Sequence, residues 1–359
     1  MERWQQQLRE SITSLEQLSE VLLYPLHPGA MEVLLKARLL ITPQTLSLID
    51  KENPACPIAR MCVPHEHELE TVGEELKDPI GDEAYLQVPH LVHRYQDRAL
   101  VQVNYACAQQ CRFCFRREKT GCATAGPRDE DFVRMAGYLR EHPEIKEVIL
   151  SGGDPLLLPD ARLNFILSLF ASIDSVERLR IHTRIPTVLP SRITPAFARM
   201  LSVQAKTLTI VTHFNHAKEL AKENRYALQL LQGAGVVVKN QAVLLRGVND
   251  QTKTLAELFQ ALLDQKVTLY YLHQLDLAKG TNHFRVPISR GKELMTGLRK
   301  QFPVGALPAY VLDIPGGGGK VSIESDQVAL LDEGVYELTD RFGNKVVYKE
   351  PVCKENLLQ

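Results

Sequence analysis

The stretch CAQQCRFCF gathers three thiolates and leaves a tetrahedral metal one ligand short. Cys107, Cys111 and Cys114 follow the apolar run ALVQVNYA with C-x3-C-x2-C spacing. A structural zinc ion normally takes four ligands, often as two pairs. None of the remaining cysteines forms a C-x2-C pair; they are Cys56, Cys62, Cys122 and Cys353. An iron–sulfur cluster can use three thiolates and leave one iron open to a ligand, so the spacing favours a cluster over zinc or plain core cysteines.

The stretch SGGDPL follows a second apolar run, EVIL, and spans residues 151–156. Glycine lets the backbone approach a ligand more closely than a side chain would permit. Gly152 and Gly153 would therefore let a ligand approach this loop closely. An ordinary strand-to-helix loop, in which Asp154 and Pro155 start the helix, is the alternative.

The stretch DIPGGGGK, residues 313–320, places a single lysine, Lys320, at the end of four glycines. The Walker pattern is absent, because Ile314 stands where its first glycine would fall and Val321 follows the lysine in place of Ser or Thr. A lysine that forms a Schiff base with pyridoxal phosphate (PLP) must swing away when a substrate amine displaces it. A flexible glycine tether suits that exchange, whereas a solvated loop is the alternative.

The elements that must position these residues alternate regularly from residue 99 onward. Runs rich in β-branched residues lie at 99–105, 147–152, 178–183, 207–212, 236–243 and 267–273. Segments of helical period lie between them at 129–142, 161–173, 194–203, 217–235 and 254–266. Alternating strands and helices predict parallel β/α units. These units are too few for an eight-stranded barrel, so we expect an α/β fold of the open, partial (β/α)6 barrel type. Ligands in such sheets gather at the carboxyl ends of the strands.

The flanks of this core have different compositions. Residues 1–48 carry apolar positions at helical spacing, and 50–100 are rich in Pro, Gly, Asp and His. We therefore expect an N-terminal helical region at 1–98, the barrel core at 99–280 and a C-terminal segment carrying Lys320 at 281–359. Residues 345–359 read as a polar tail.

Composition narrows the class of protein. Hydrophobic residues make up 45% of the 359 residues, and the formal net charge is −1. Nothing in this balance favours nucleic acid or a membrane surface as a partner. No stretch approaches the roughly 20 apolar residues that span a bilayer, and the N-terminus lacks the apolar core of a signal peptide. An odd number of cysteines, seven, fits a reducing cytoplasm better than a disulfide framework.

Several stretches together, and in this order, resemble the lysine 2,3-aminomutase family of radical S-adenosylmethionine (SAM) enzymes. They are CAQQCRFCFRR, SGGDPL, THFNH, NQAVLLRGVND, YYLHQLD, HFRVP and DIPGGGGK, and the resemblance runs from about residue 86 to about residue 345. It implies a [4Fe–4S] cluster on the three cysteines, with SAM chelated by the open iron and cleaved to a 5′-deoxyadenosyl radical. It also implies PLP bound to Lys320 and the interconversion of L-lysine and β-lysine.

The resemblance also assigns roles to other positions. Arg116 would bind the substrate carboxylate through its fork of donors, and Asp276 with Asp313 would grip the ε-ammonium, since a buried ammonium left unpaired is unfavourable. The expected SAM residues are Ser151, Gly152, Gly153, Asp154, His213 and Gln241. Arg94 and Arg98 would hold the anionic oxygens of PLP, with surface ion pairs, for instance to Asp97, as their alternative role.

Two features depart from the family pattern. Longer members build an intersubunit zinc site from a cysteine-rich C-terminal extension, but this chain ends soon after Cys353 and has Gln251 where that site would want a cysteine. Its length and N-terminal stretch are similar to relatives that supply (R)-β-lysine to elongation factor P, although those lack DIPGGGGK and the acidic pair.

We expect free L-lysine as the substrate, an electron donor such as flavodoxin or ferredoxin, and a homo-oligomer. Elongation factor P as a partner, or another amino acid as the substrate, is the alternative.

Overall fold

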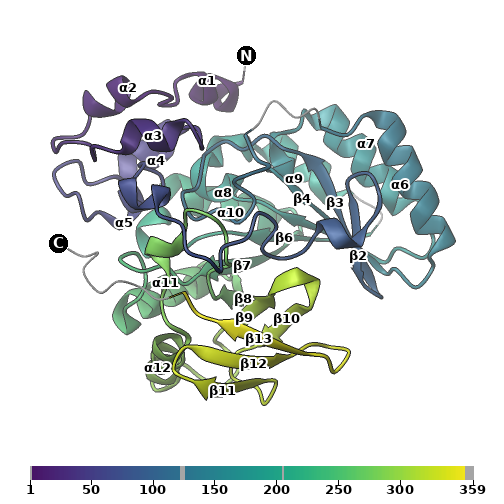
Figure 1. Cartoon of the computed structure of the whole chain (residues 1–359). Helices are drawn as coiled ribbons and strands as arrows, with labels where there is room; N and C mark the ends of the chain where they lie inside the picture. Colours follow the sequence, from purple (N-terminus) through teal and green to yellow (C-terminus); the bar gives the residue numbers. More distant parts are fainter. Residues whose placement is uncertain (1, 122–125, 204–205, 352–359) are drawn as a thin grey trace.

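The computed structural model describes residues 2–121, 126–203 and 206–351, and these form a ten-stranded sheet whose strands follow one another in sequence order (Figure 1). The strands are β1 (Leu86–Val88), β2 (Leu91–Tyr95), β3 (Arg98–Asn104), β4 (Glu147–Gly152), β5 (Arg178–His182), β6 (Thr207–Thr212), β7 (Val237–Val243), β8 (Thr268–His273), β9 (Ala309–Ile314) and β10 (Gly319–Ser322). Strands β3 to β9 pair in parallel, whereas β1, β2 and β10 run antiparallel to their neighbours. The expected open, partial barrel is confirmed.

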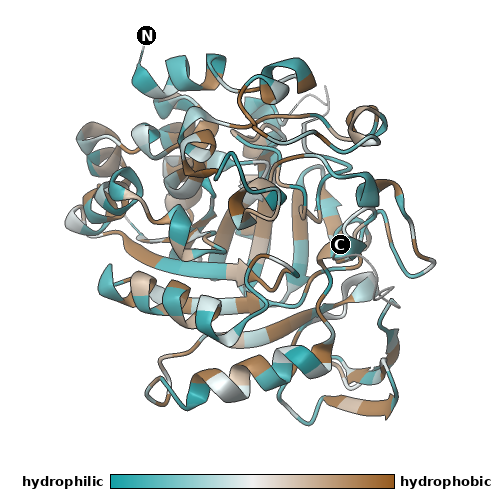
Figure 2. Ribbon diagram, turned by 90° about the vertical axis from the view of Figure 1, so that its left-hand side faces the viewer, coloured by the Kyte–Doolittle hydropathy of each residue, from teal (hydrophilic) through white to brown (hydrophobic). Residues whose placement is uncertain are grey.

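Helices connect the parallel strands. They are α6 (Asp129–Glu141), α7 (Asp160–Ala171), α8 (Ile185–Val188), α9 (Pro195–Ser202), α10 (Lys222–Gly233), α11 (Thr252–Asp264) and α12 (Ile288–Arg299). Helix α11 shows why they pack there, because its buried residues Leu255, Leu258, Phe259 and Leu262 recur every three or four positions. Figure 2 shows mainly hydrophobic strands enclosed by helices whose colours alternate between brown and teal.

Burial of the strands follows from this arrangement. Every residue of β4 is buried, because a parallel sheet is covered on both faces. In strand β7 buried residues alternate with less buried ones, because successive side chains of a strand point to opposite faces of the sheet. One large core contains side chains from both the sheet and the helices, so the carboxyl ends of the strands are held on a rigid platform.

The N-terminal segment contains helices, but they are short, and residues 86–95 of the region expected to be helical form strands β1 and β2 of the sheet. The helices are α1 (Arg3–Arg9), α2 (Leu15–Ser19), α3 (Ala30–Leu34), α4 (Pro43–Leu48) and α5 (Pro57–Arg60). A second hydrophobic core joins this segment to Phe113, Leu245, Leu275 and Phe284, which lie beyond the carboxyl ends of β3, β7 and β8. The segment therefore covers the loops at the end of the sheet where ligands are expected.

The C-terminal region contains more regular structure than the sequence indicated. Strand β9 is an unpredicted seventh parallel strand, and α12 precedes it. Strands β11 (Val328–Asp332), β12 (Val335–Thr339) and β13 (Lys345–Lys349) form a separate antiparallel sheet. The prediction of a polar tail from residue 345 is wrong for 345–349, because β13 pairs with β12 and buries Tyr348. Residues 352–359 lie outside the described residues.

Among the described helices, none is long and apolar enough to cross a membrane.

Candidate active site

A cavity of about 430 Å³ is lined by residues of the sheet and of the loops at the carboxyl ends of the parallel strands. Every candidate site residue predicted from the sequence lines it. They are Arg94, Arg98, Cys107, Cys111, Cys114, Arg116, Ser151, Gly152, Gly153, Asp154, His213, Gln241, Asp276, Asp313 and Lys320. These residues come from segments more than 200 positions apart in the chain, so the parallel topology is what brings them together.

The cysteine loop follows β3 and is anchored by the N-terminal segment. The backbone N–H of Gln110 donates to the Leu40 carbonyl at 3.0 Å, and that of Arg112 donates to the Met61 carbonyl at 2.9 Å. All three cysteines of the loop are free thiols. Burial raises the pKa of Cys107 and of Cys114, so a bound cation is needed for them to act as thiolates.

The three cysteines suit a cluster better than a single ion. Among the described residues, no group of three or more His, Cys, Asp or Glu side chains is arranged to hold one metal ion. In an iron–sulfur cluster each thiolate binds a different iron, so the thiolates need not converge on one point. Cys56 and Cys62 are buried in the N-terminal core, whereas Cys122 and Cys353 lie outside the described residues.

The SGGDPL loop packs directly against the start of the cysteine loop. Gly152 has a φ of 110°, and a Cβ on Gly152 or Gly153 would overlap the backbone of Asn104 or Ala106. The Gly153 N–H donates to Asn104 at 2.7 Å, and the Asp154 N–H donates to Ala106 at 2.7 Å. The glycines are thus required for the two loops to touch, whatever ligand they hold.

The Asp154 side chain ties this loop to the end of β5. Its carboxylate accepts hydrogen bonds from the Thr183 hydroxyl at 2.6 Å and from the Arg184 backbone N–H at 2.7 Å. It also accepts from the Leu156 N–H at 3.1 Å, as expected for a residue that starts a helical turn. Burial raises the pKa of Asp154 to about 6.

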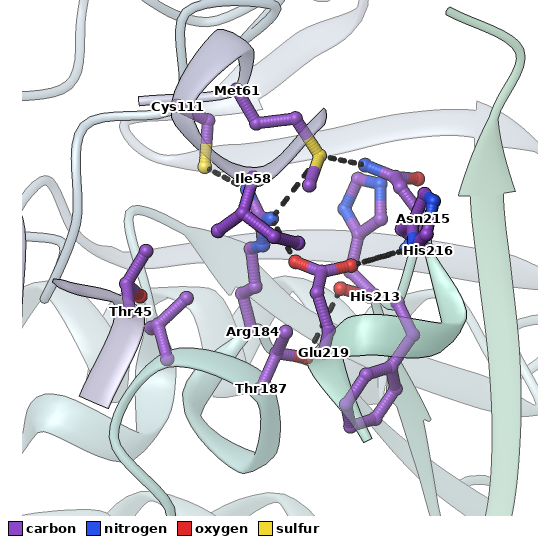
Figure 3. Close-up of polar contacts among 12 residues, drawn as sticks. Thr45, Ile58, Met61, Cys111, Arg184, Thr187, His213, Asn215, His216 and Glu219 are labelled. Carbon is purple, nitrogen blue, oxygen red and sulfur yellow. Dashed lines mark hydrogen bonds and ion pairs between the residues drawn. The ribbon is translucent and has the colours of Figure 1, made fainter. Parts of the chain in front are cut away.

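Arg184, which sequence reasoning missed, contacts the cysteine loop (Figure 3). Its Nη1 donates to Cys111 Sγ at 2.6 Å, and its Nη2 donates to Glu219 Oε1 at 2.6 Å. Burial alone lowers the pKa of Arg184, but Cys111 and Glu219 outweigh it and the pKa is raised. Glu219 Oε2 accepts from the backbone N–H groups of Asn215 and His216, so this network joins the ends of β5 and β6 to the cysteines. The position of Arg184, two residues beyond a strand, was the available signal.

His213 lies just beyond β6. Its ring packs edge-on against Phe113 with the ring centres 5.6 Å apart. Within the part of the chain that the structure describes, its Nε2 is buried and has no hydrogen-bond partner. Gln241 lies on the neighbouring strand β7.

Lys320 faces Asp313 across a hairpin. The two residues are directly opposite each other in the β9–β10 pairing, and Lys320 Nζ lies 2.8 Å from Asp313 Oδ1. The first three of the four glycines lie in the turn between β9 and β10, and Gly319 begins β10. Gly317 has a φ of 92°, and a Cβ there would overlap the ring of Tyr85.

The acids around Lys320 differ in their protonation. Burial and the charge of Asp313 raise the pKa of Asp276 to about 7. Burial also acts to raise the pKa of Asp313, but Lys320 and His273 outweigh it and hold that pKa well below its usual range. His273, a second residue missed from the sequence, places Nδ1 3.6 Å from Asp313 Oδ2. Burial lowers the pKa of Lys320, but Asp313 outweighs it and the pKa is raised, so this pair is ionised.

The arginines of the cavity are paired with acids. Asp82, a third missed residue, contacts both Arg94 at 2.8 Å and Arg116 at 2.7 Å. Arg98 forms a bidentate pair with Asp97 at 2.8 and 2.9 Å, which matches the alternative role expected for it, although it also lines the cavity.

The cavity also holds buried donors that a polar ligand would satisfy. Among the described residues, the Nε atoms of Arg94, Arg116 and Arg184 and the Nε2 atom of His182 are buried without a hydrogen-bond partner. Together with three thiols, an ionised lysine and paired acids, they fit a site for anionic and zwitterionic ligands beside an iron–sulfur cluster.

Comparison with known proteins points to the same chemistry. Residues 101–259 match the Radical SAM superfamily. The chain is 37% identical to L-lysine 2,3-aminomutase from Clostridium subterminale over 97% of this chain and 84% of that protein. It is also 37% identical to glutamate 2,3-aminomutase from Clostridioides difficile over 89% and 76% of the two chains. Among solved structures, Streptococcus suis SuiB bound to S-adenosylmethionine matches 64% of this chain and 53% of its own at 14% identity, with a TM-score of 0.47.

Proposed function

We propose, because the chain belongs to the L-lysine 2,3-aminomutase family of radical SAM enzymes, that it interconverts L-lysine and β-lysine. The observation that carries the proposal is the contact between Lys320 and Asp313 beside Asp276. There a primary ammonium already sits 2.8 Å from a buried carboxylate, with a second acid in the same cavity. This is the environment that the ε-ammonium of a lysine substrate requires.

Three bound groups would complete the site: a [4Fe–4S] cluster and SAM supply a 5′-deoxyadenosyl radical, and PLP stabilises the substrate-derived radical. The cluster would be held by Cys107, Cys111 and Cys114. The residues for SAM are Ser151, Gly152, Gly153, Asp154, His213 and Gln241. PLP would be held by Lys320, with its anionic oxygens near Arg94 and Arg98. The free thiols and the unpartnered donors of the cavity support these assignments.

The two ends of the substrate would be held by opposite charges. Arg116 would present a guanidinium fork to the α-carboxylate, and Asp313 would bind the ε-ammonium at the place that the Lys320 ammonium takes when no PLP is bound. Asp276, with a pKa of about 7, is the acid whose charge changes near neutral pH. It can therefore contact the bound ammonium either as a neutral acid, which accepts a hydrogen bond, or as a carboxylate, which forms an ion pair.

The acidic pair argues against glutamate as the substrate. The distal carboxylate of glutamate would face Asp313, which is ionised, in a buried site where like charges repel strongly. Ornithine and arginine, which also carry a distal cation, are distinguished from lysine only by length and shape.

We also propose where the protein is located and what it works with. The described cysteines of the chain are free thiols, which supports a reducing cytoplasm as its location. We also propose a flavodoxin or ferredoxin as the electron donor, a homo-oligomeric state, and a division of the chain at residues 98 and 280, although the ten-stranded sheet crosses both positions.

An anaerobic assay tests the proposed function. The reconstituted protein would be incubated with SAM, PLP, a reductant and one of four amino acids: lysine, ornithine, arginine or glutamate. Products would be identified by mass spectrometry after chiral derivatisation. We expect β-lysine from lysine and none from the Cys111→Ala control. Turnover of glutamate in place of lysine would overturn the substrate assignment.

A further inference from the structure

The Asp82 carboxylate connects two arginines that the proposed function places at different ligands. Its Oδ1 accepts a hydrogen bond from Arg94 Nη2 at 2.8 Å, and its Oδ2 accepts one from Arg116 Nη2 at 2.7 Å. The side chains of Asp82, Arg94 and Arg116 are only 6%, 8% and 12% exposed. Burial by itself raises the pKa of Asp82, but the two arginines outweigh it and the pKa lies below the usual value. The bridge is therefore buried and ionised.

The bridge leaves part of each guanidinium available. Arg116 also donates from Nη1 to the Ser151 hydroxyl at 3.2 Å. Among the described residues, the Nε atoms of Arg94 and Arg116 are buried without a partner. Because the five donors of a guanidinium lie in one rigid plane, a contact at one edge fixes where the remaining donors point. Asp82 thus orients both arginines and leaves the Nε–H of each free to donate to a ligand.

The segment that carries Asp82 also packs against the turn that precedes Lys320. Gly81 has a φ of 66°, and a Cβ there would overlap the backbone of Gly316 and Gly317. The Lys320 N–H in turn donates to the Tyr95 hydroxyl at 2.9 Å. A shift of the Gly81–Asp82 backbone would therefore displace either the glycine turn or the arginines.

We propose that Asp82 is a positioning residue that fixes Arg116 relative to Arg94, and both relative to Lys320. Resting on the proposed function, this means that one carboxylate sets the distance between the site for the substrate carboxylate and the site for the anionic oxygens of PLP. Without its charge the two guanidinium groups would repel each other in a buried site and would turn apart. Asp82 would touch neither ligand itself.

The Asp82→Asn variant tests this coupling. We expect its Kd for PLP, measured by absorbance titration of the cluster-reconstituted protein without SAM or lysine, to rise at least tenfold. We expect the KM for L-lysine to rise at least tenfold as well, with a smaller change in kcat. A purely structural role would lower the melting temperature without moving both constants together.

Glu68→Gln provides a matched control. The Glu68 carboxylate also bridges two arginines, Arg112 and Arg117, and these three side chains are at most 8% exposed. None of the three lines the cavity. We expect Glu68→Gln to lower the melting temperature while the Kd for PLP of the folded protein stays within twofold of the wild-type value.

Asp82→Glu decides the question if Asp82→Asn does not fold. It keeps the charge but moves the carboxylate by one methylene, so we expect a melting temperature near wild type and a KM for lysine raised several-fold. Wild-type KM and PLP affinity in Asp82→Glu, or in a folded Asp82→Asn, would overturn the proposal.

If the wild-type protein bound PLP but did not convert lysine, the substrate assignment would fail, whereas the PLP titrations would still test the link between Asp82 and Arg94.

Discussion

Replacing Asp313 with asparagine should cripple lysine turnover while leaving the cofactor sites loaded. The Asp313 side chain is only 5% exposed, and its carboxylate contacts the Lys320 ammonium at 2.8 Å. Under the proposed function the substrate ε-ammonium takes the place of the Lys320 ammonium. In Asp313→Asn that cation would face an amide and would keep only Asp276 as a charged partner.

The size of the effect follows from burial. Removing one partner of a buried ion pair typically costs about 3–5 kcal/mol, because the remaining charge is left uncompensated. At about 1.4 kcal/mol for each factor of ten in rate, kcat/KM for L-lysine should fall roughly 150- to 5,000-fold. Loss of a solvent-exposed ion pair would lower kcat/KM less than tenfold. The size of the decrease in Asp313→Asn therefore also shows whether the ion pair is shielded from water.

The pKa of Lys320 should also change in Asp313→Asn, and this change distinguishes the loss of the Asp313 charge from a general disruption of the site. Asp313 is the charge that raises the pKa of Lys320 against the opposing effect of burial. Without it burial dominates, so the pKa of Lys320 should fall and its neutral, nucleophilic form should persist at lower pH. The rate of PLP loading, followed by absorbance, should therefore reach its maximum at a lower pH in Asp313→Asn.

The assay is kcat/KM for L-lysine under anaerobic conditions, with iron and PLP content measured on the same samples. Asp160→Asn is the control, because Asp160 pairs with Arg192 at 2.6 Å and neither residue lines the cavity. We expect the control to retain kcat/KM within about twofold. Wild-type turnover of lysine by Asp313→Asn, with normal cofactor content, would refute the assignment of the acidic pair as the specificity device.

Other outcomes follow from the same site. Cys111→Ala should lose most of its iron and all SAM cleavage, whereas zinc at one equivalent in the wild-type protein would contradict a cluster. Borohydride reduction should attach PLP to the peptide containing Lys320, and a label on another lysine would refute that role. Arg116→Lys should raise the KM for lysine at least tenfold, since an ammonium cannot reproduce the guanidinium fork; an unchanged KM would place the carboxylate elsewhere. The pKa of Asp276 is raised to about 7, so the folded protein retains a proton that the unfolded chain releases. Its contribution to stability should fall as pH rises from about 4 to 7, and thermal unfolding of Asp276→Asn should show a weaker dependence on pH over that range than the wild-type protein.

Residues close together in sequence were predicted well because their spacing is itself the signal. The cysteine loop, the glycines at 152 and 153 and the strand runs from 99 to 273 are all local patterns, and the topology of a parallel sheet then collects their ends. Strand β9 was missed although Pro308 and Pro315 bracket its sequence, AYVLDI, because the Pro- and Gly-rich stretch on both sides of it is typical of irregular structure.

The residues that were missed share a different property, since each acts through a partner far away in the chain. Asp82 meets Arg116 across 34 positions, and Arg184 meets Cys111 across 73. Isolated acids and arginines in loops are common on protein surfaces. Arg184 carries one local signal, its position two residues beyond a strand, whereas nothing local distinguishes Asp82 from a solvated residue. Only the folded structure shows that they are buried and paired.

The hairpin that ends in Lys320 does more than carry the lysine on a run of glycines. The length of its turn sets the register of β9 against β10. Ile314 pairs with Gly319, so Asp313 stands directly opposite Lys320 and their side chains share one face of the sheet. Successive residues of a strand point to opposite faces, so one residue more or fewer in the turn would carry the lysine away from the aspartate and out of the cavity. Gly316, Gly317 and Gly319 have left-handed backbone, and a Cβ on Gly317 would collide with the ring of Tyr85. The contact between lysine and carboxylate that supports the proposed function is therefore a consequence of the number of residues between them.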